Sequence, residues 1–125
     1  MISVANAQDL GPVEQWPRNY VYVGRAVPRR GFKASPLANP YHVGGQYEVR
    51  SGVPPLRIQF GRRECVAYYE PWLIEQLNAS ICHTQVEFGR LLRMAGEGDL
   101  VLVCWCHPKR CHADTIKRLL EADIS

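Results

Sequence analysis

The sequence lacks the features that mark exported and membrane proteins. None of its apolar runs approaches the roughly 20 residues that a helix needs to cross a bilayer. Residues 1–15 lack the succession of basic, apolar and small residues that forms a secretion signal. The chain also contains no internal repeat and no low-complexity segment. We therefore expect a cytoplasmic globular protein without a membrane partner.

Acidic residues are scarce between Gly24 and Arg63. The segment holds one of them, Glu48, against eight basic residues, so it carries a formal charge of +7 while the rest of the chain carries −4. Such asymmetry favours an anionic partner, either a small molecule such as a nucleotide or a nucleic acid. A solvated basic loop would have the same composition.

Cysteine is present in an odd number. Five cysteines cannot all pair within one chain, and without a secretion signal they are more often reduced thiols or metal ligands than a disulfide framework. The length of 125 residues, with 46% hydrophobic and 22% charged residues, is typical of one globular domain over residues 1–125.

Three segments are typical of β-strands. Met1–Asn6 is the weakest, and Tyr20–Val23 is rich in β-branched and aromatic residues. Asp99–Cys106 contains a continuous Leu-Val-Leu-Val run, which suits a strand buried on both faces of a parallel sheet. The intervening segment Arg25–Ile58 is full of Gly and Pro. We expect it to form functional loops, over about residues 24–58, with at most one short strand.

Three helices are expected. Arg62–Leu77 has apolar residues at helical spacing, but Pro71 interrupts it and predicts a kink or a second helix that begins there. Thr84 and Glu87 have the spacing of a capping box that starts the next helix, and Gly96 ends it. The last helix follows the cysteine-rich motif and places Ala113, Ile116, Leu119 and Leu120 on one face.

The order of these elements predicts an α/β fold. We expect a small single domain with a mainly parallel, Rossmann-like sheet flanked by helices. Tyr20–Val23 and Leu100–Cys104 should be parallel neighbours, with the final helix packed on their sheet.

The strongest functional signal lies where the last strand meets the final helix. Ligands collect at the carboxyl ends of parallel strands, because the following helix offers free N–H groups and a partial positive charge. At this junction the chain places three of its five cysteines and two of its four histidines within residues 104–112. This density predicts a site.

One interpretation of the site is catalysis by a thiolate. Cys111 would stand at the helix start beside Lys109 and Arg110, surroundings that lower the pKa of a thiol, and His112 or Asp114 would move protons. We accordingly expect Cys111 to be partly accessible and more acidic than a free cysteine.

A second interpretation is a metal site, and a third is purely structural. Cys106, Cys111 and His112 are candidate zinc ligands, and a fourth ligand would come from His42, His83, Cys65 or Cys82. The spacing matches no standard zinc finger or ferredoxin. In the structural interpretation the thiols fill the core, and Cys104 in particular is expected to be buried and inert. Trp105 should point to the opposite face of the strand and pack in the core.

Three segments of the sequence resemble one known family. They are Tyr22–Arg25 at a strand end, Ser35–Tyr41 in the loop, and Cys104–Asp114, which reads CWCHPKRCHAD. Together they resemble the family called domain of unknown function 4326, small proteins of bacteria and their phages that typically read GR, then NPF, then CWC-x-P-x-x-CH-x-D. Tyr41 stands where the family has Phe, the stretch Gly44–Ile58 is less typical, and a weaker similarity links the last motif to domain of unknown function 488. The resemblance implies that one site is formed by Gly24, Arg25, Asn39, Pro40, Cys106, Cys111, His112 and Asp114.

We hypothesise an enzyme that acts on a nucleotide, a nucleoside or a related phosphorylated small molecule. Arg25 and the basic loop would hold the anion, and Asn39 would orient a polar group. The catalytic residues would be Cys111, His112 and Asp114, and the ligand-binding residues would be Gly24, Arg25, Asn39, Pro40, Tyr41 and Cys106. The alternative is a non-enzymatic zinc-binding module that binds nucleic acid or a host protein through its basic face.

Overall fold

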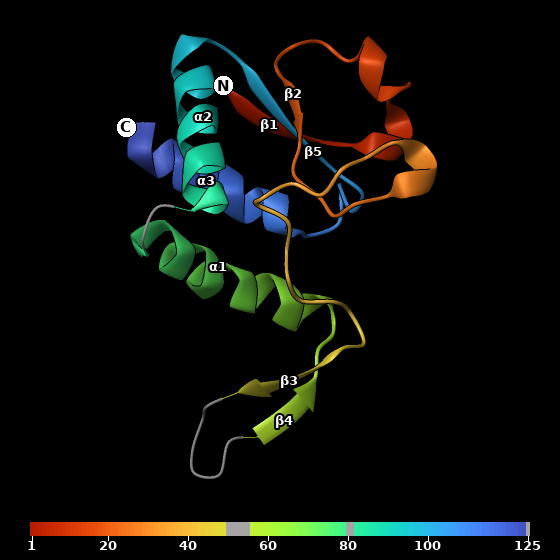
Figure 1. The fold of residues 1–125 in the computed structure, drawn as a ribbon, viewed down its shortest axis with the longest axis vertical. Helices are drawn as coiled ribbons and strands as arrows, with labels where there is room; N and C mark the ends of the chain where they lie inside the picture. Colours follow the sequence, from red (N-terminus) through yellow and green to blue (C-terminus); the bar gives the residue numbers. More distant parts are fainter. Residues whose placement is uncertain (50–55, 80–81, 125) are drawn as a thin grey trace.

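The computed structural model describes residues 1–49, 56–79 and 82–124 of the chain. At its centre is a three-stranded parallel sheet (Figure 1), in the order β1 (Ile2–Asn6), β5 (Leu100–Cys104), β2 (Tyr20–Tyr22). Strands β2 and β5 pair in parallel, with Tyr20 opposite Val101. The predicted pairing of these two strands is therefore confirmed, and the predicted first strand is present as β1.

Strand β5 is buried on both of its faces. Leu100, Leu102 and Cys104 belong to the larger core cluster, on the side of the helices, and each is at most 1% exposed. Val103 and Val101 alternate with them and pack into a second cluster on the other face. Successive side chains of a strand point to opposite faces. Because both faces of β5 are covered, the segment is apolar at every position.

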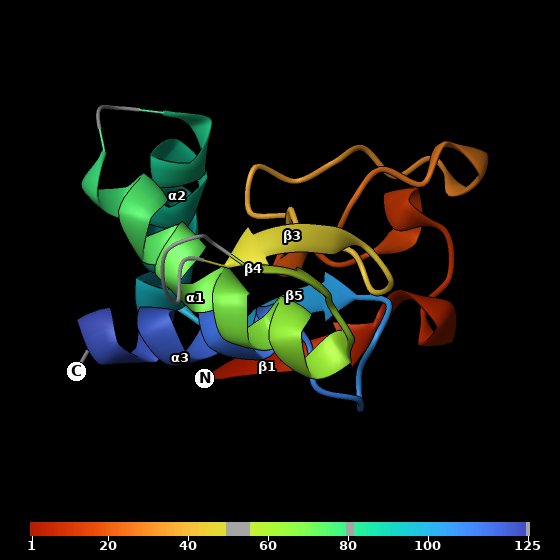
Figure 2. The same ribbon diagram turned by 90° about the horizontal axis from the view of Figure 1, so that it is seen from below.

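Three helices form a layer on the side of the larger cluster (Figures 1 and 2): α1 (Arg62–Asn78), α2 (His83–Glu97) and α3 (His112–Ile124). Helices α2 and α3 contact β5, while α1 packs on α2 and α3. Ala113, Ile116 and Leu120 are fully buried on one face of α3, as their spacing predicted. None of the helices in the described part of the chain is long and apolar enough to cross a membrane.

Irregular chain covers the other face of the sheet. Here the short 3-10 helices η1 (Ala7–Asp9), η2 (Val13–Gln15) and η3 (Pro28–Arg30) and their loops pack Trp16 and Phe32 near Trp105. Trp105 therefore lies on the face opposite Cys104, as expected. The helices flank one face of the sheet, and loops flank the other.

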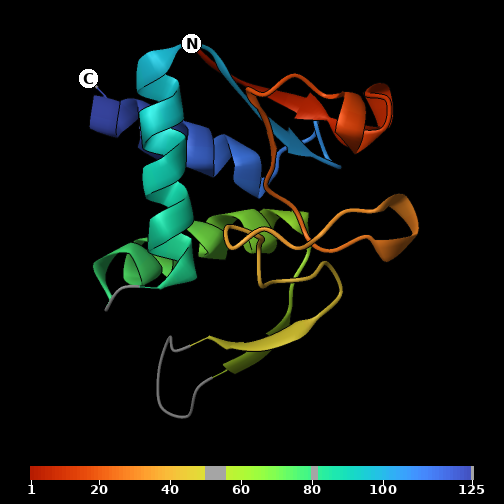
Figure 3. The same cartoon turned by 45° about the horizontal axis from the view of Figure 1, so that its top comes forward.

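The loop region contains an antiparallel hairpin that the sequence did not predict. Strands β3 (Gln46–Val49) and β4 (Leu56–Gln59) pair with each other and stand on the far side of α1 from the parallel sheet (Figures 1 and 3). The expectation of at most one short strand is wrong. Each strand has four residues, too few to give a clear alternating pattern, and the pair is held by Tyr47, Ile58 and Val49 packing near Phe60.

Helix α1 runs through Pro71 as one element, so the predicted second helix does not begin there. Proline removes one backbone hydrogen bond from the helix. Tyr69 and Leu73, on either side of Pro71, are 0% exposed in the larger core cluster. Packing of the helix before and after Pro71 therefore outweighs the free energy lost with that hydrogen bond.

Helix α2 begins and ends close to the predicted residues but by different means. Its N-cap is Cys82, and the Thr84 hydroxyl donates to the Pro36 carbonyl oxygen (3.0 Å) instead of capping the helix. Glu87 pairs with Arg90. The predicted capping box is therefore wrong, because a tertiary contact uses the threonine. The helix passes Gly96 and ends at Glu97.

The loop before the hairpin is anchored to the helices rather than free. Leu37 is 0% exposed, and its carbonyl oxygen accepts a hydrogen bond from the buried Tyr69 hydroxyl (2.6 Å). The bond from Thr84 to Pro36 fixes the preceding residue. Together these bonds hold the following turn, Asn39–Tyr41, beside the start of α1.

We predict that Tyr69→Phe lowers the free energy of unfolding by about 1–3 kcal/mol, because it leaves the buried Leu37 carbonyl without its donor. Urea denaturation followed by fluorescence measures the change. The matched control is Tyr68→Phe, on the exposed side of the same helix, which should change stability by less than about 0.5 kcal/mol. Equal effects of the two substitutions would contradict the anchoring role.

Candidate functional site

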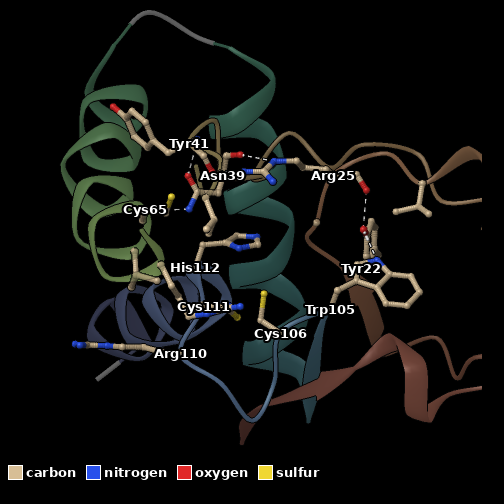
Figure 4. Close-up of a pocket in the computed structure, with 15 residues that line it drawn as sticks. Tyr22, Arg25, Asn39, Tyr41, Cys65, Trp105, Cys106, Arg110, Cys111 and His112 are labelled. Atoms are coloured by element: carbon tan, nitrogen blue, oxygen red, sulfur yellow. Dashed lines mark hydrogen bonds between the residues drawn. The ribbon is translucent and has the colours of Figure 1, made fainter. Parts of the chain in front are cut away.

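A cavity of about 280 Å³ opens at the carboxyl ends of β2 and β5 (Figure 4). The first turns of α1 and α3 form part of its wall, as do the anchored turn and the segment that follows β2. Its lining consists of Tyr22, Gly24, Arg25, Val27, Asn39, Tyr41, Val43, Arg62, Cys65, Val66, Trp105, Cys106, Arg110, Cys111 and His112. The position is the one expected for a ligand site in a parallel sheet.

The cavity brings together most of the residues that the sequence singled out. Seven of them line it: Gly24, Arg25, Asn39, Tyr41, Cys106, Cys111 and His112. Pro40 and Asp114 are exposed and do not belong to the lining. The expectation that Arg25, the turn and the start of the final helix form one pocket is confirmed.

Asp114 caps the helix rather than facing the cavity. One carboxylate oxygen of Asp114 accepts a hydrogen bond from the backbone N–H of Cys111 (3.1 Å), and the Asp114 N–H donates back to the Cys111 carbonyl oxygen. A side chain at the third helical position often makes this bond. Asp114 therefore fixes the backbone that places Cys111 and His112 in the cavity wall.

Gly24 allows a close approach at the end of β2. A Cβ atom at this position would lie 2.5 Å from the Tyr22 hydroxyl oxygen, so a side chain would displace that ring. The Tyr22 hydroxyl donates to the Arg25 carbonyl oxygen (2.6 Å) and accepts from the Trp105 indole N–H (2.9 Å). Glycine thus lets Tyr22 join β2, β5 and the following loop at the edge of the cavity.

Arg25 and Asn39 hold the turn in place. The Arg25 guanidinium donates to the carbonyl oxygens of Asn39 (3.0 Å) and Tyr41. The Asn39 side-chain amide donates to the Cys65 carbonyl oxygen (3.0 Å), and its oxygen accepts from the Tyr41 N–H (2.9 Å). Asn39 is 8% exposed, so its polar atoms serve mainly to join the turn to α1.

Positive charge dominates the wall of the cavity. Arg25, Arg62 and Arg110 line it, and the lining contains no Asp or Glu among the described residues. The starts of α1 and α3 add the partial positive charge of two helix N-termini. Arg62 is one of the eight basic residues between Gly24 and Arg63, but no sequence motif assigned it to the site. A cation at the first position of a helix opposes the helix dipole. This unfavourable placement is the sequence feature that would have indicated a role for Arg62.

Three thiols meet at the base of the cavity. The Cys111 thiol donates to the Cys104 sulfur (3.3 Å) and also interacts with the Cys106 sulfur. The hydrogen bond from Cys111 lowers the pKa of Cys106 to about 5, helped by the nearby guanidinium groups of Arg62 and Arg25, while burial works against them. Cys106 is half-buried and lines the cavity, so it is the thiolate that a ligand meets.

Cys111 does not have the properties that the sequence predicted. It is 3% exposed, and the pKa of its thiol is raised, because its single S–H proton is shared with the neighbouring sulfurs of Cys104, to which it donates, and Cys106, and because it is buried. The helix start and the neighbouring basic residues were correct features of its position, but burial among other sulfurs outweighs them. The accessible, acidic thiol is Cys106. Cys104 is buried as expected, but the hydrogen bond from Cys111 lowers the pKa of Cys104 to about 7, so its expected inertness is not supported.

His112 is buried and held by the backbone. Its Nε2 lies 2.6 Å from the Val23 carbonyl oxygen, and its ring meets the edge of Tyr69 at a centroid distance of 5.1 Å. Burial lowers the pKa of the imidazole, which favours the neutral ring. Because a carbonyl oxygen only accepts, Nε2 carries the proton and Nδ1 keeps its lone pair.

The described side chains are not gathered as metal ligands. Across residues 1–49, 56–79 and 82–124, no three His, Cys, Asp or Glu side chains have an arrangement that could hold a metal ion. Of the candidate ligands Cys106, Cys111 and His112, the His112 ring is bonded to the backbone and Cys111 to Cys104. Of the expected fourth ligands, Cys65 lines the cavity but is buried, and His42, His83 and Cys82 lie outside the lining.

We predict that Cys106 is the first of the three clustered cysteines to be alkylated. Its rate should rise with pH through about 5 and be level by neutral pH, because the thiolate is the nucleophile. Iodoacetamide labelling followed by peptide mass spectrometry measures the profile, with the half-buried Cys82 as the reference thiol. Arg62→Ala should move the Cys106 profile to higher pH. Labelling of Cys111 before Cys106 would show that this assignment is wrong.

Comparison with known proteins identifies the family of the chain. No curated protein and no solved structure matches it. One family model, described as Domain of unknown function (DUF4326), matches residues 10–122. The match spans strands β2 and β5, at whose ends the cavity opens, and the full cysteine-rich motif, in agreement with the resemblance noted from the sequence. The chain belongs to the family described as Domain of unknown function (DUF4326).

Proposed function

We propose that the chain is an enzyme that binds a nucleotide, a nucleoside or a related phosphorylated small molecule in this cavity. The observation that carries the proposal is the wall itself: three arginines and two helix starts contribute to the lining of one cavity, and no carboxylate lines it among the described residues. An anion bound there would relieve the mutual repulsion of these charges. Helix N-termini and arginine forks are the usual partners of phosphate groups.

The size and the apolar part of the cavity support a small ligand. Its volume of about 280 Å³ is near the lower end of the range for small-molecule sites. Tyr22, Tyr41 and Trp105 contribute aromatic residues to the lining, and Val43 and Val66 add apolar surface. A base or sugar would pack against this surface while its phosphate meets the arginines. We propose that the sheet works as Rossmann-like folds do, with the ligand at the carboxyl ends of its strands.

The candidate nucleophile is the Cys106 thiolate. Its sulfur faces the cavity beside Arg62, and the buried Cys111 thiol stabilises it by a hydrogen bond. Neutral His112 has the lone pair of Nδ1 left for accepting a proton from a ligand or water. Asp114 acts as a positioning residue, through its bond to the Cys111 backbone. Such a thiolate needs reduced cysteines, which fits a cytoplasmic location.

We predict that a nucleoside monophosphate or a sugar phosphate stabilises the protein, and that Arg62→Ala weakens its binding at least tenfold. A panel of such compounds is tested by thermal shift, in which a ligand at 100 times its Kd adds about 2.7 kcal/mol of stability. Calorimetry then gives the Kd of each hit. Arg63→Ala is the matched control, since Arg63 is exposed, neighbours Arg62 on α1 and does not line the cavity.

The outcomes separate binding from catalysis. Cys106→Ser should keep the affinity for the ligand but abolish its conversion, followed by NMR of the ligand over time. If no phosphorylated compound in the panel binds, or if Arg63→Ala costs as much as Arg62→Ala, the proposal is wrong. If the ligand binds but stays unchanged with the wild-type protein, the site is a binding site without catalysis.

A further inference from the structure

A second cavity lies next to the first. It has a volume of about 490 Å³ and is formed by the segment around η2, by β2, by the residues after η3 and by α2. Its lining includes Trp16, Arg18, Tyr20, Phe32, Lys33 and Arg90. Tyr22 lines both cavities, so the two spaces adjoin at this residue.

A chain of aromatic rings connects the two cavities. Phe32 lies 5.5 Å from Trp16 and 4.5 Å from Tyr22 between ring centroids, and 5.4 Å from Trp105, which lines the first cavity. Phe32 is buried and supports the others, whereas Trp16 is half-buried and offers ring surface to the second cavity. A ligand that extends from one cavity to the other would therefore pass along ring surface.

The second cavity also carries unneutralised positive charge. Glu87 is the one acidic residue among its described lining, and both of its oxygens are bonded to the Arg90 guanidinium, at 2.7 and 2.8 Å. Arg18 and Lys33 are exposed and have no ion-pair partner within the described residues. The short helix η3 lies in the sequence between residues that line the first cavity and residues that line the second. It adds the exposed cations Arg29 and Arg30.

We propose that the second cavity binds the neighbouring nucleotides of a single-stranded nucleic acid, one unit of which occupies the first cavity. This inference rests on the proposed function, and it assigns the substrate class: a nucleotide within a polynucleotide rather than a free one. Proteins bind single strands by combining a line of cations for the phosphates with aromatic side chains on which bases stack. Both features continue here from one cavity to the next. A duplex keeps its bases stacked inside, where the ring of Trp16 would have no face to meet, whereas the Trp105 ring already has the Arg30 guanidinium over it, 5.6 Å from its centroid.

The experiment compares a polymer with its own monomer. The probes are a fluorescein-labelled single-stranded octamer of random sequence, as DNA and as RNA, and the corresponding nucleoside monophosphates. We expect the octamer to bind at least tenfold more tightly than any monophosphate, measured by fluorescence polarisation and calorimetry. The DNA and RNA arms decide which of the two sugars the site prefers.

The variant Arg18→Ala/Lys33→Ala tests the second cavity alone. It should weaken octamer binding about tenfold and lower the slope of log K against log salt by about 1.4, because each lost phosphate contact on a single strand contributes about 0.7. Binding of the monophosphate should not change. The control Arg93→Ala/Lys117→Ala removes the same charge from helix positions that line neither cavity, and it should leave both affinities near those of the wild type.

Each outcome assigns success or failure to one of the two proposals. If monophosphates bind through Arg62 but the octamer binds no better, or Arg18→Ala/Lys33→Ala has no effect on it, the single-strand inference is wrong and the proposed function stands. If the octamer binds and depends on Arg18 and Lys33 while Arg62→Ala has no effect on either probe, the proposed function is wrong. A duplex of the same length that binds as tightly as the single strand would also overturn the inference.

Discussion

The burial of strand β5 on both faces is the constraint on which the rest of the structure depends. Leu100 and Leu102 need a layer on one side, and Val101 and Val103 need another. Helices α2 and α3 supply the first layer, and the N-terminal loops with Phe32 supply the second. Neighbours β1 and β2 must run parallel to β5, so all three strands end at one edge. The cavity lies at that edge because the layers leave space where the strands stop.

The charge of the cavity opposes the stability of the protein. Arg62 lies at the start of α1 and Arg110 just before α3, where the helix dipoles disfavour cations. Carboxylates at the same helix starts, Glu64 on α1 and Asp114 on α3, offset part of this cost. The anchored turn is a further compensation: Tyr69, Asn39 and Arg25 fix its backbone by hydrogen bonds that do not depend on a ligand. Proteins commonly contain locally unfavourable placements of side chains that the surrounding structure stabilises.

The three clustered thiols show how packing redistributes acidity among similar groups. A cysteine at a helix start next to basic residues has the features of an activated thiol, and Cys111 has them. Because Cys111 is buried, it keeps its proton and acts as a hydrogen-bond donor. The negative charge instead resides on Cys106, which is nearer to the solvent and to Arg62. The acidic, more accessible thiol is therefore Cys106, five residues before Cys111 in the same motif.

The sequence by itself determined the secondary structure that has strong periodicity and the location of the site. The apolar run of β5, the stripe of α3 and the motif Cys104–Asp114 follow from side-chain chemistry that acts over a few residues. Only the tertiary structure decided which thiol is exposed, that Thr84 bonds to Pro36 instead of capping α2, and that β3 pairs with β4. These outcomes depend on contacts between segments far apart in the chain. Burial and hydrogen-bond partners are set by those contacts, and a local pattern does not contain them.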